Sequence, residues 1–154
     1  CMPNTPALVG SGASGLFANA RVSAAQRDIA DQLLGAVGLS VWVDSEADID
    51  SVTALSGSGP AYFFLMMEAM QESAVKLGLT PAMAKSLTYQ TALGAAQLAI
   101  ASEEDTAQLR RNVTSPNGTT ERAINHFEDG GLRQLVDGAL TAARDRSVEL
   151  ADEV

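Results

Sequence analysis

Residues 58–70, SGPAYFFLMMEAM, shape the architecture of this chain more than any other segment. Ser58 and Pro60 favour a helix start, and a helix is expected over Tyr62–Leu77. Its apolar side chains cover almost the whole circumference, so it must be buried on several sides. A second subunit can supply one of those sides, and the alternative is a central helix in a monomeric bundle.

Outward from this segment, helix start and stop signals recur from about Ser45 to the end of the sequence, and strand signals vanish. Serine, threonine and proline open the expected helices, and glycine closes several of them. The fold is therefore expected to be mostly α. The further helices are expected at Asp48–Leu55, Pro81–Ala101, Thr106–Val113, Thr120–Asp129 and Leu132–Glu153.

The first 45 or so residues follow a different pattern. Leu8–Ala18 is punctuated by glycine and expected to be extended, and Val41–Val43 is expected to form a second short strand. A helix is expected between these two strands. Ser23 and Gln26 form a capping box at its start, and Gly38 is placed to cap its end. Two short strands make no stable sheet alone, so this segment is interpreted as the tail of a larger α/β domain.

Composition narrows the classes of function. The chain has 154 residues, a net charge of −9 and 5% aromatic residues. This charge argues against nucleic acid or an anionic membrane as a partner. The single cysteine favours a reducing, cytoplasmic setting, and neither a membrane span nor a targeting leader is expected.

Val113–Ala123, VTSPNGTTERA, combines a proline turn, a glycine and two hydroxyls with a helix start. Asn117 or Gly118 can take positive φ, and Thr119 or Thr120 can cap the helix. Its free amides would converge on one carboxylate or phosphate at the positive end of the helix dipole. An ordinary turn with a helix cap is the competing interpretation.

The usual catalytic and metal-binding arrangements are missing from the sequence. His126 has no cysteine and carboxylate cluster around it, and no metal site is expected. Ser56–Pro60 is glycine-rich but lacks the lysine of a phosphate-binding loop, so it is interpreted as a helix junction. No G-x-G-x-x-G motif opens a strand-helix unit.

Three segments together resemble one family, pyrroline-5-carboxylate reductase. They are Met2–Pro6, Ala54–Tyr62 and Val113–Ala123, and they occur in the family's order. The resemblance covers essentially the whole chain. Family members also carry a glycine-rich nucleotide-binding segment that this sequence lacks, so the chain is interpreted as the C-terminal portion of a longer enzyme.

The resemblance implies a fold and an assembly. Residues 1–45 would be the remnant of a Rossmann-like NAD(P)H-binding domain, and 46–154 an all-α substrate-binding and dimerisation domain resembling the C-terminal domain of 6-phosphogluconate dehydrogenase. The helical domains would form an interlocked homodimer, and five dimers a decamer. NADPH or NADH would be the cofactor, bound mainly by residues outside this chain.

The resemblance also implies roles for single residues. The amides of Gly118, Thr119 and Thr120 would hold the carboxylate of 1-pyrroline-5-carboxylate, and the Thr120 hydroxyl would bind the ring nitrogen as the catalytic contact. Ser115 and Glu103 would lie at the substrate. The residues implied near the cofactor are Asn4, Glu46, Ser58, Pro60 and Asn112. Asn117 departs from the glycine that many members have at this position.

The function that the resemblance implies is NAD(P)H-dependent reduction of 1-pyrroline-5-carboxylate to L-proline. Hydride addition to a protonated cyclic imine needs positioning and charge complementarity more than a general acid, which fits the missing acid-base residue. The isolated chain is expected to be inactive. The alternatives are a non-catalytic helical dimerisation module and a related imine or hydroxyacid reductase with another substrate.

Overall fold

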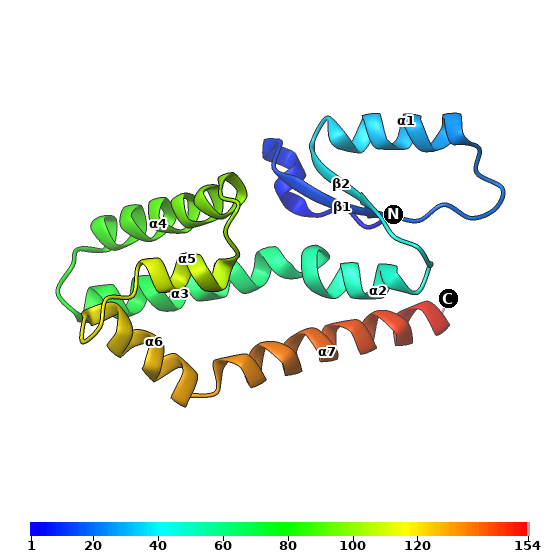
Figure 1. Cartoon of the computed structure of the whole chain (residues 1–154). Helices are drawn as coiled ribbons and strands as arrows, with labels where there is room; N and C mark the ends of the chain where they lie inside the picture. Colours follow the sequence, from blue (N-terminus) through cyan, green and yellow to red (C-terminus); the bar gives the residue numbers. More distant parts are fainter. Residues whose placement is uncertain (154) are drawn as a thin grey trace. The chain divides into compact units, whose positions relative to one another are not determined.

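The computed structural model describes residues 1–153, and its elements divide into two compact units. The first unit contains residues 1–63 and the chain from residue 136 onward, and the second contains Phe64–Leu135. Figure 1 shows the elements in chain order. This contact-based division does not coincide with the expected split between residues 45 and 46, which remains a prediction about the parent protein.

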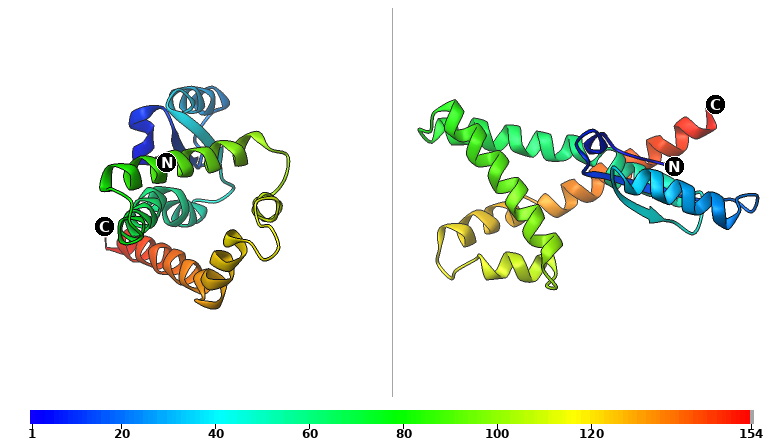
Figure 2. Two further views of the ribbon diagram at one scale, coloured as in Figure 1. Left: turned by 90° about the vertical axis from the view of Figure 1, so that its left-hand side faces the viewer. Right: turned by 90° about the horizontal axis from the view of Figure 1, so that it is seen from above.

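The first unit contains a small parallel sheet. Strand β1 (Gly12–Leu16) pairs with β2 (Gly38–Trp42), and helix α1 (Ala24–Gly35) connects them and packs on β2 (Figure 2). The capping box that starts α1 is confirmed: the Ser23 amide donates to Gln26 Oε1 at 2.9 Å, and the Gln26 amide to Ser23 Oγ at 3.4 Å. The predicted strand-helix-strand unit is therefore present.

Two details of this unit differ from the expectation. Residues Thr5–Val9 form a 3-10 helix, η1, so Leu8 and Val9 are not extended. Gly38 does not cap α1, because the helix ends at Gly35 and Ala36 is its cap. Gly38 instead opens β2 with φ +152°, where any Cβ would collide with the carbonyl oxygen of Gly12. The close approach of two backbones, rather than a helix end, requires this glycine.

The junction before the long apolar helix contains a π-helical turn. Helix α2 (Asp48–Val52) runs into η2 (Thr53–Gly57), and α3 follows at Gly59–Lys76. The Ser58 amide donates to the Thr53 carbonyl at 2.8 Å, which closes the wide turn. The single short helix expected over Asp48–Leu55 is thus split, since π turns interrupt the α-helical register.

The second unit is helical, as predicted. It includes α4 (Pro81–Ala101), α5 (Thr106–Asn112) and α6 (Thr119–Asp129), and α7 (Leu132–Asp152) follows. Thr80 caps α4 through its hydroxyl, which accepts from the Met83 amide at 3.3 Å.

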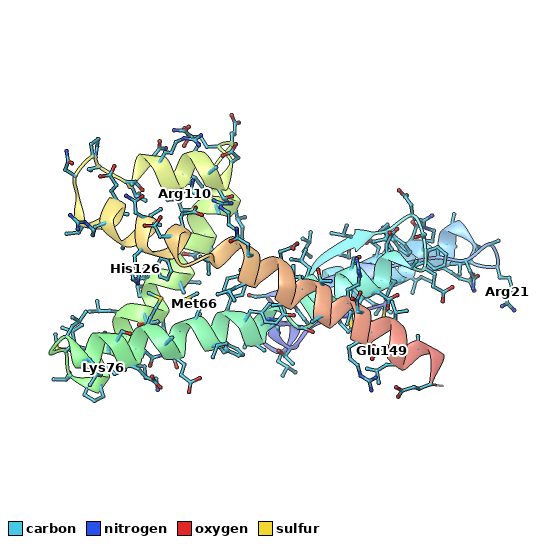
Figure 3. The ribbon with its side chains drawn as sticks, turned by 90° about the horizontal axis from the view of Figure 1, so that it is seen from below. Arg21, Met66, Lys76, Arg110, His126 and Glu149 are labelled. Atoms are coloured by element: carbon cyan, nitrogen blue, oxygen red, sulfur yellow. The ribbon has the colours of Figure 1, made fainter. Side chains whose placement is uncertain are left out.

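The apolar faces of these helices are largely uncovered. On α3, Phe64 and Leu65 are 62% and 65% exposed, and Met66, labelled in Figure 3, is 40% exposed. On α4, Leu87 and Leu98 are each 55% exposed. The buried apolar residues of the described chain are Leu16, Ala54 and Ala84. In the described chain, α3 is therefore not enclosed by neighbouring helices.

Candidate functional site

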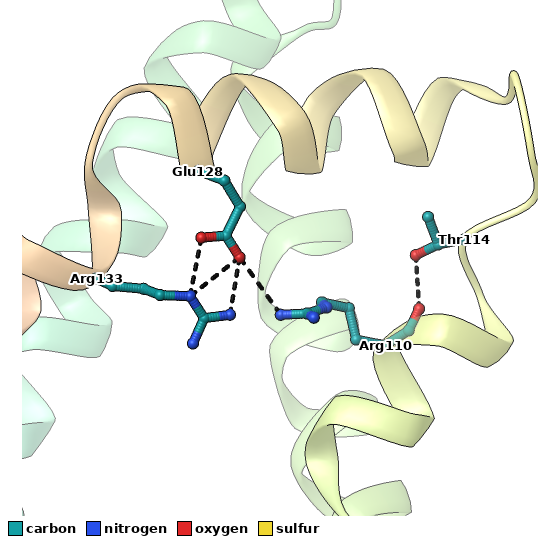
Figure 4. Close-up of polar contacts among 4 residues, drawn as sticks. All are labelled: Arg110, Thr114, Glu128 and Arg133. Atoms are coloured by element: carbon teal, nitrogen blue, oxygen red, sulfur yellow. Dashed lines mark hydrogen bonds and ion pairs between the residues drawn. The ribbon is translucent and has the colours of Figure 1, made fainter.

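The turn between α5 and α6 is fixed at its entry by Thr114. The Thr114 hydroxyl donates to the carbonyl oxygen of Arg110 at 2.6 Å, and its amide donates to the carbonyl of Arg111 at 3.0 Å (Figure 4). Both acceptors lie in the last turn of α5. Two carbonyls at the end of α5 are thereby satisfied, and the direction in which the chain leaves the helix is set.

The turn itself is built by Ser115–Gly118. Pro116 stands at its second position, and Asn117 has φ +59°, the one positive φ outside glycine among the described residues. The Asn117 amide donates to Glu121 Oε2 at 2.8 Å. Asparagine tolerates this conformation better than most residues, so the replacement of the family's glycine leaves the turn intact.

Gly118 has a different role from the one expected. Its φ is −84°, and its amide donates to the Ser115 carbonyl at 3.0 Å, so the amide closes the turn and is not free to bind a ligand. A Cβ at this position would stand 2.9 Å from the Ser115 oxygen. Glycine is required here by the tight closure of the turn. Gly118, and neither threonine, is the N-cap of α6.

The first turn of α6 leaves three donors open. Arg122 is the first residue within α6 whose amide donates to a preceding carbonyl, that of Gly118, at 3.2 Å. In the described part of the chain, the amides of Thr119, Thr120 and Glu121 have no acceptor. Their dipoles converge at the positive end of the helix, which favours an anion. The Glu121 amide, at the third position of α6, was not among the predicted donors, whereas the Gly118 amide, which was, is bonded to Ser115.

The side chains around these amides differ in exposure. Thr120 is half-buried, and Thr119 and Ser115 are exposed. The Glu121 carboxylate accepts from the Asn117 amide, so a negative charge lies beside the open donors. The turn thus offers a small anion three amides and a half-buried hydroxyl, with one carboxylate opposing it.

Two other predicted residues of the second unit lie before and within α5. Asn112 Nδ2 donates to Glu104 Oε2 at 2.6 Å, and its Oδ1 accepts from Gln108 Nε2 at 2.7 Å. The exposed Glu103, predicted at the substrate, takes no part in this network. Glu104 is the carboxylate that faces Asn112, which local sequence could not distinguish from its neighbour.

The remaining predicted cofactor residues lie in the first unit. Asn4 bridges two elements: its Nδ2 donates to the Ser56 carbonyl at 2.9 Å, and its Oδ1 accepts from the Ala13 amide at 2.9 Å. Glu46 is exposed in the turn before α2. At the start of α3, Ser58 and Pro60 are half-buried. The bridging amide of Asn4 is thus already occupied within the protein.

The glycines of β1 do not form a nucleotide-binding loop. Gly10–Gly15 has the G-x-G-x-x-G spacing, but β1 contains most of it and α1 starts well beyond it. A Cβ on Gly12 would approach the Ala7 Cβ to 2.9 Å, and one on Gly15 would approach Val52 Cγ1 to 2.5 Å. These glycines permit close packing of η1 and α2 against the strand.

Residues 1–153 contain neither a metal-binding cluster nor a membrane-spanning helix. No group of three or more histidine, cysteine, aspartate or glutamate side chains is placed to hold a metal ion. His126, labelled in Figure 3, is exposed on α6. None of the helices there is both long and apolar enough to cross a lipid bilayer.

Known proteins resemble this chain over nearly its whole length. The family described as pyrroline-5-carboxylate reductase dimerisation matches residues 46–150. The pyrroline-5-carboxylate reductase of Pseudomonas aeruginosa is 62% identical over 154 residues, which are 100% of this chain and 56% of the relative. The enzyme of Haemophilus influenzae is 46% identical over 97% of this chain and 55% of the relative.

Solved structures agree with the sequence relatives. A pyrroline-5-carboxylate reductase from Coxiella burnetii has a TM-score of 0.94 and 56% identity, over 97% of this chain and 55% of that one. The Plasmodium falciparum pyrroline carboxylate reductase with NADP bound has a TM-score of 0.89 and 33% identity, over 95% of this chain and 59% of that one. The chain thus spans somewhat more than half the length of these relatives, and it belongs to the pyrroline-5-carboxylate reductase family.

Proposed function

We propose that this chain is the substrate-binding and dimerisation part of an enzyme that reduces 1-pyrroline-5-carboxylate to L-proline with NAD(P)H. The observation that carries the proposal is the open first turn of α6, where three amides await an anion. Membership of the reductase family supplies the identity of that anion. The chemistry of the turn fits a small carboxylate better than a nucleotide, since it carries no lysine or arginine to neutralise several phosphates.

In this proposal the amides of Thr119, Thr120 and Glu121 hold the substrate carboxylate. The half-buried Thr120 hydroxyl accepts the N–H of the protonated ring nitrogen and so fixes the face of the C=N bond. Bound NAD(P)H supplies the hydride that adds to C5. No proton need be delivered at that step, because the imine nitrogen is already protonated, so orientation is the main task of these residues.

The cofactor residues of this chain fit only a limited contact. Asn4 is occupied by Ser56 and Ala13, so it orders the segment beside it and does not itself bind. Ser58 and Pro60 would hold the nicotinamide side. The described residues contain no phosphate-binding glycine loop, and the choice between NADPH and NADH stays open. The Plasmodium relative binds NADP.

We further propose that the chain works as a homodimer in the cytoplasm, with a decamer of five dimers as the larger assembly. The chain leaves 11232 Å² accessible, about 1.5 times the roughly 7,400 Å² expected for a folded monomer of this length. That surplus of exposed surface is available to a second copy of the chain and to the part of the relatives that this chain does not span. The exposed apolar residues of α3 and α4 account for much of it.

The test is NAD(P)H oxidation by the protein with its complete nucleotide-binding domain. Thr120→Ala should lower kcat/KM by about tenfold, because one positioned hydrogen bond is lost. Thr119→Ala is the matched control, since it keeps the amide and removes an exposed hydroxyl. Equal kinetics for Thr120→Ala and wild type would remove the hydroxyl from the mechanism.

The same assay separates the alternatives. A non-catalytic helical module would dimerise by light scattering but neither quench NADPH fluorescence nor turn over. A related imine or hydroxyacid reductase would turn over another substrate far better than 1-pyrroline-5-carboxylate. The isolated chain should dimerise without catalysis.

A further inference from the structure

Three charged side chains from three helices meet at the far end of α6. Arg133, at the start of α7, makes a two-pronged contact with Glu128, with Nη2 2.8 Å from Oε1 and Nε 2.9 Å from Oε2. Arg110 of α5 reaches the same carboxylate, with Nη1 3.6 Å from Oε1. Figure 4 shows Arg110 and Arg133 approaching Glu128 from opposite sides.

This cluster is too exposed to be explained by stability. The side chains of Arg110 and Glu128 are 39% and 40% exposed, and that of Arg133 is 66% exposed. Ion pairs with this exposure add little to folding. The hydrogen bonds from Arg133 lower the pKa of Glu128, and those to Glu128 raise the pKa of Arg133, so both groups stay charged. The geometry is well defined nonetheless, because a paired guanidinium and carboxylate orient each other.

Arg110 joins this cluster to the substrate turn. Its guanidinium points to Glu128, and its carbonyl oxygen accepts the Thr114 hydroxyl at 2.6 Å. Thr114 is the last residue before Ser115–Gly118. One residue therefore touches both the entry of the turn and the far end of the helix whose first amides form the anion site.

The turn has few other restraints. Helix α5 has seven residues, too few to be stable by itself. Among the described residues, the ion pair of Arg110 and Glu128 is the polar side-chain contact between α5 and α6. The contact between Arg110 and Glu128 therefore helps the turn to set the angle between the two helices. A change in that angle would shift the Thr119 and Thr120 amides relative to the rest of the site.

We propose that Glu128 and Arg133 are positioning residues for the substrate: Arg133 orients Glu128, Glu128 holds Arg110, and Arg110 sets the turn that presents the carboxylate-binding amides. This rests on the proposed function. The three residues touch neither substrate nor cofactor, and they act only through the turn. Loss of the cluster therefore weakens binding of the carboxylate substrate and leaves NADPH binding and folding nearly unchanged.

The first test is steady-state kinetics on the complete protein. Glu128→Gln should raise the KM for 1-pyrroline-5-carboxylate by about fivefold, the scale of one exposed ion pair, with the KM for NADPH and the melting temperature unchanged. Arg133→Lys keeps the charge and loses the paired geometry, so its KM should be intermediate. An unchanged substrate KM in Glu128→Gln would overturn the proposal.

A matched control lies on α7. Arg146 Nη1 lies 2.9 Å from Glu149 Oε2 and 2.9 Å from Glu153 Oε1, and the Arg146 side chain is 53% exposed. Neither of these ion pairs includes a residue of α5, of the turn or of α6. Arg146→Gln should leave every kinetic constant unchanged. A KM shift equal to that of Glu128→Gln would mean that loss of surface charge, rather than positioning, causes the effect.

A double variant tests the route through Arg110. If Glu128 acts only by holding Arg110, then Arg110→Met combined with Glu128→Gln should raise the KM no further than Arg110→Met alone. A double variant whose rise in KM equals the product of the two single-variant rises would contradict action through Arg110.

Hydrogen exchange separates this inference from the proposed function. If the wild-type protein does not reduce 1-pyrroline-5-carboxylate, the proposed function fails. The claim that Glu128 orders the turn through Arg110 can still be measured. The hydrogen-bonded amides of Thr114, Asn117 and Gly118 should exchange about fivefold faster in Glu128→Gln than in wild type or Arg146→Gln. Equal exchange rates would overturn the positioning role independently of catalysis.

Discussion

Two junctions between helices, Ser56–Pro60 and Ser115–Thr120, have similar compositions and opposite outcomes. At the first, side chains satisfy the backbone: Asn4 binds the Ser56 carbonyl, and the Tyr62 hydroxyl donates to the Ala54 carbonyl at 3.1 Å. At the second, the turn closes on itself and leaves three amides of α6 without an acceptor. Small polar residues therefore do not distinguish a structural junction from an anion site. The backbone amides without an acceptor distinguish the two junctions.

Among the variants that test this comparison, Gly118→Ala is expected to have the largest effect. The new Cβ would stand 2.9 Å from the Ser115 oxygen, so the turn must open and move the donors that follow it. We expect kcat/KM of the complete enzyme to fall about a hundredfold. Gly94→Ala on α4, where a Cβ meets nothing within 4 Å, is the control for side-chain addition. A Gly118→Ala enzyme with wild-type kinetics would show that the closed turn is not required.

The closed junction should fail differently. Asn4→Ala removes both hydrogen bonds that join Ser56 to Ala13 and should destabilise the protein by about 2 kcal/mol in urea unfolding. Asn19→Ala, which loses one exposed contact to the Arg21 amide, should change stability by less than about 0.5 kcal/mol. Equal stabilities for the two variants would remove Asn4 as the link between these segments.

The smallest effect sharpens the comparison at the open turn. Glu121→Gln removes the negative charge beside the three donors and keeps an acceptor for the Asn117 amide. The KM for the carboxylate substrate should fall about twofold to threefold, since a charge near a helix start is worth a few tenths of a kcal/mol or more. The shift should shrink in high salt. A raised KM would mean that the carboxylate orders the turn more than it repels the substrate.

Local sequence predicted the helices well because their signals are local. The Ser23 and Gln26 capping box and the Thr80 cap each connect residues three apart. The same reasoning failed where geometry rather than residue type decides. The Gly118 amide was expected to be open, but it closes the turn on Ser115, and the open amides are those of Thr119, Thr120 and Glu121. Tight closure, not positive φ, explains that glycine.

The long-range contacts could not be predicted from local pattern. Asn4 meets Ser56 across 52 positions, and Arg110 meets Glu128 from another helix. Neither pair has a helical spacing or a motif that marks it. The π turn at Thr53–Gly57 was also hidden, because its residues read equally well as the end of an ordinary helix.

The central claim is that the open amides of α6 bind the substrate carboxylate. Its most direct test is an NMR titration of the complete protein with L-proline, the proposed product, which carries the same carboxylate. The account predicts that the amide resonances of Thr119, Thr120 and Glu121 shift downfield together and saturate with one affinity. The Gly118 amide, already bonded to Ser115, should shift least. Saturating proline with no change at these three amides, or changes confined to Ser56–Pro60, would contradict it.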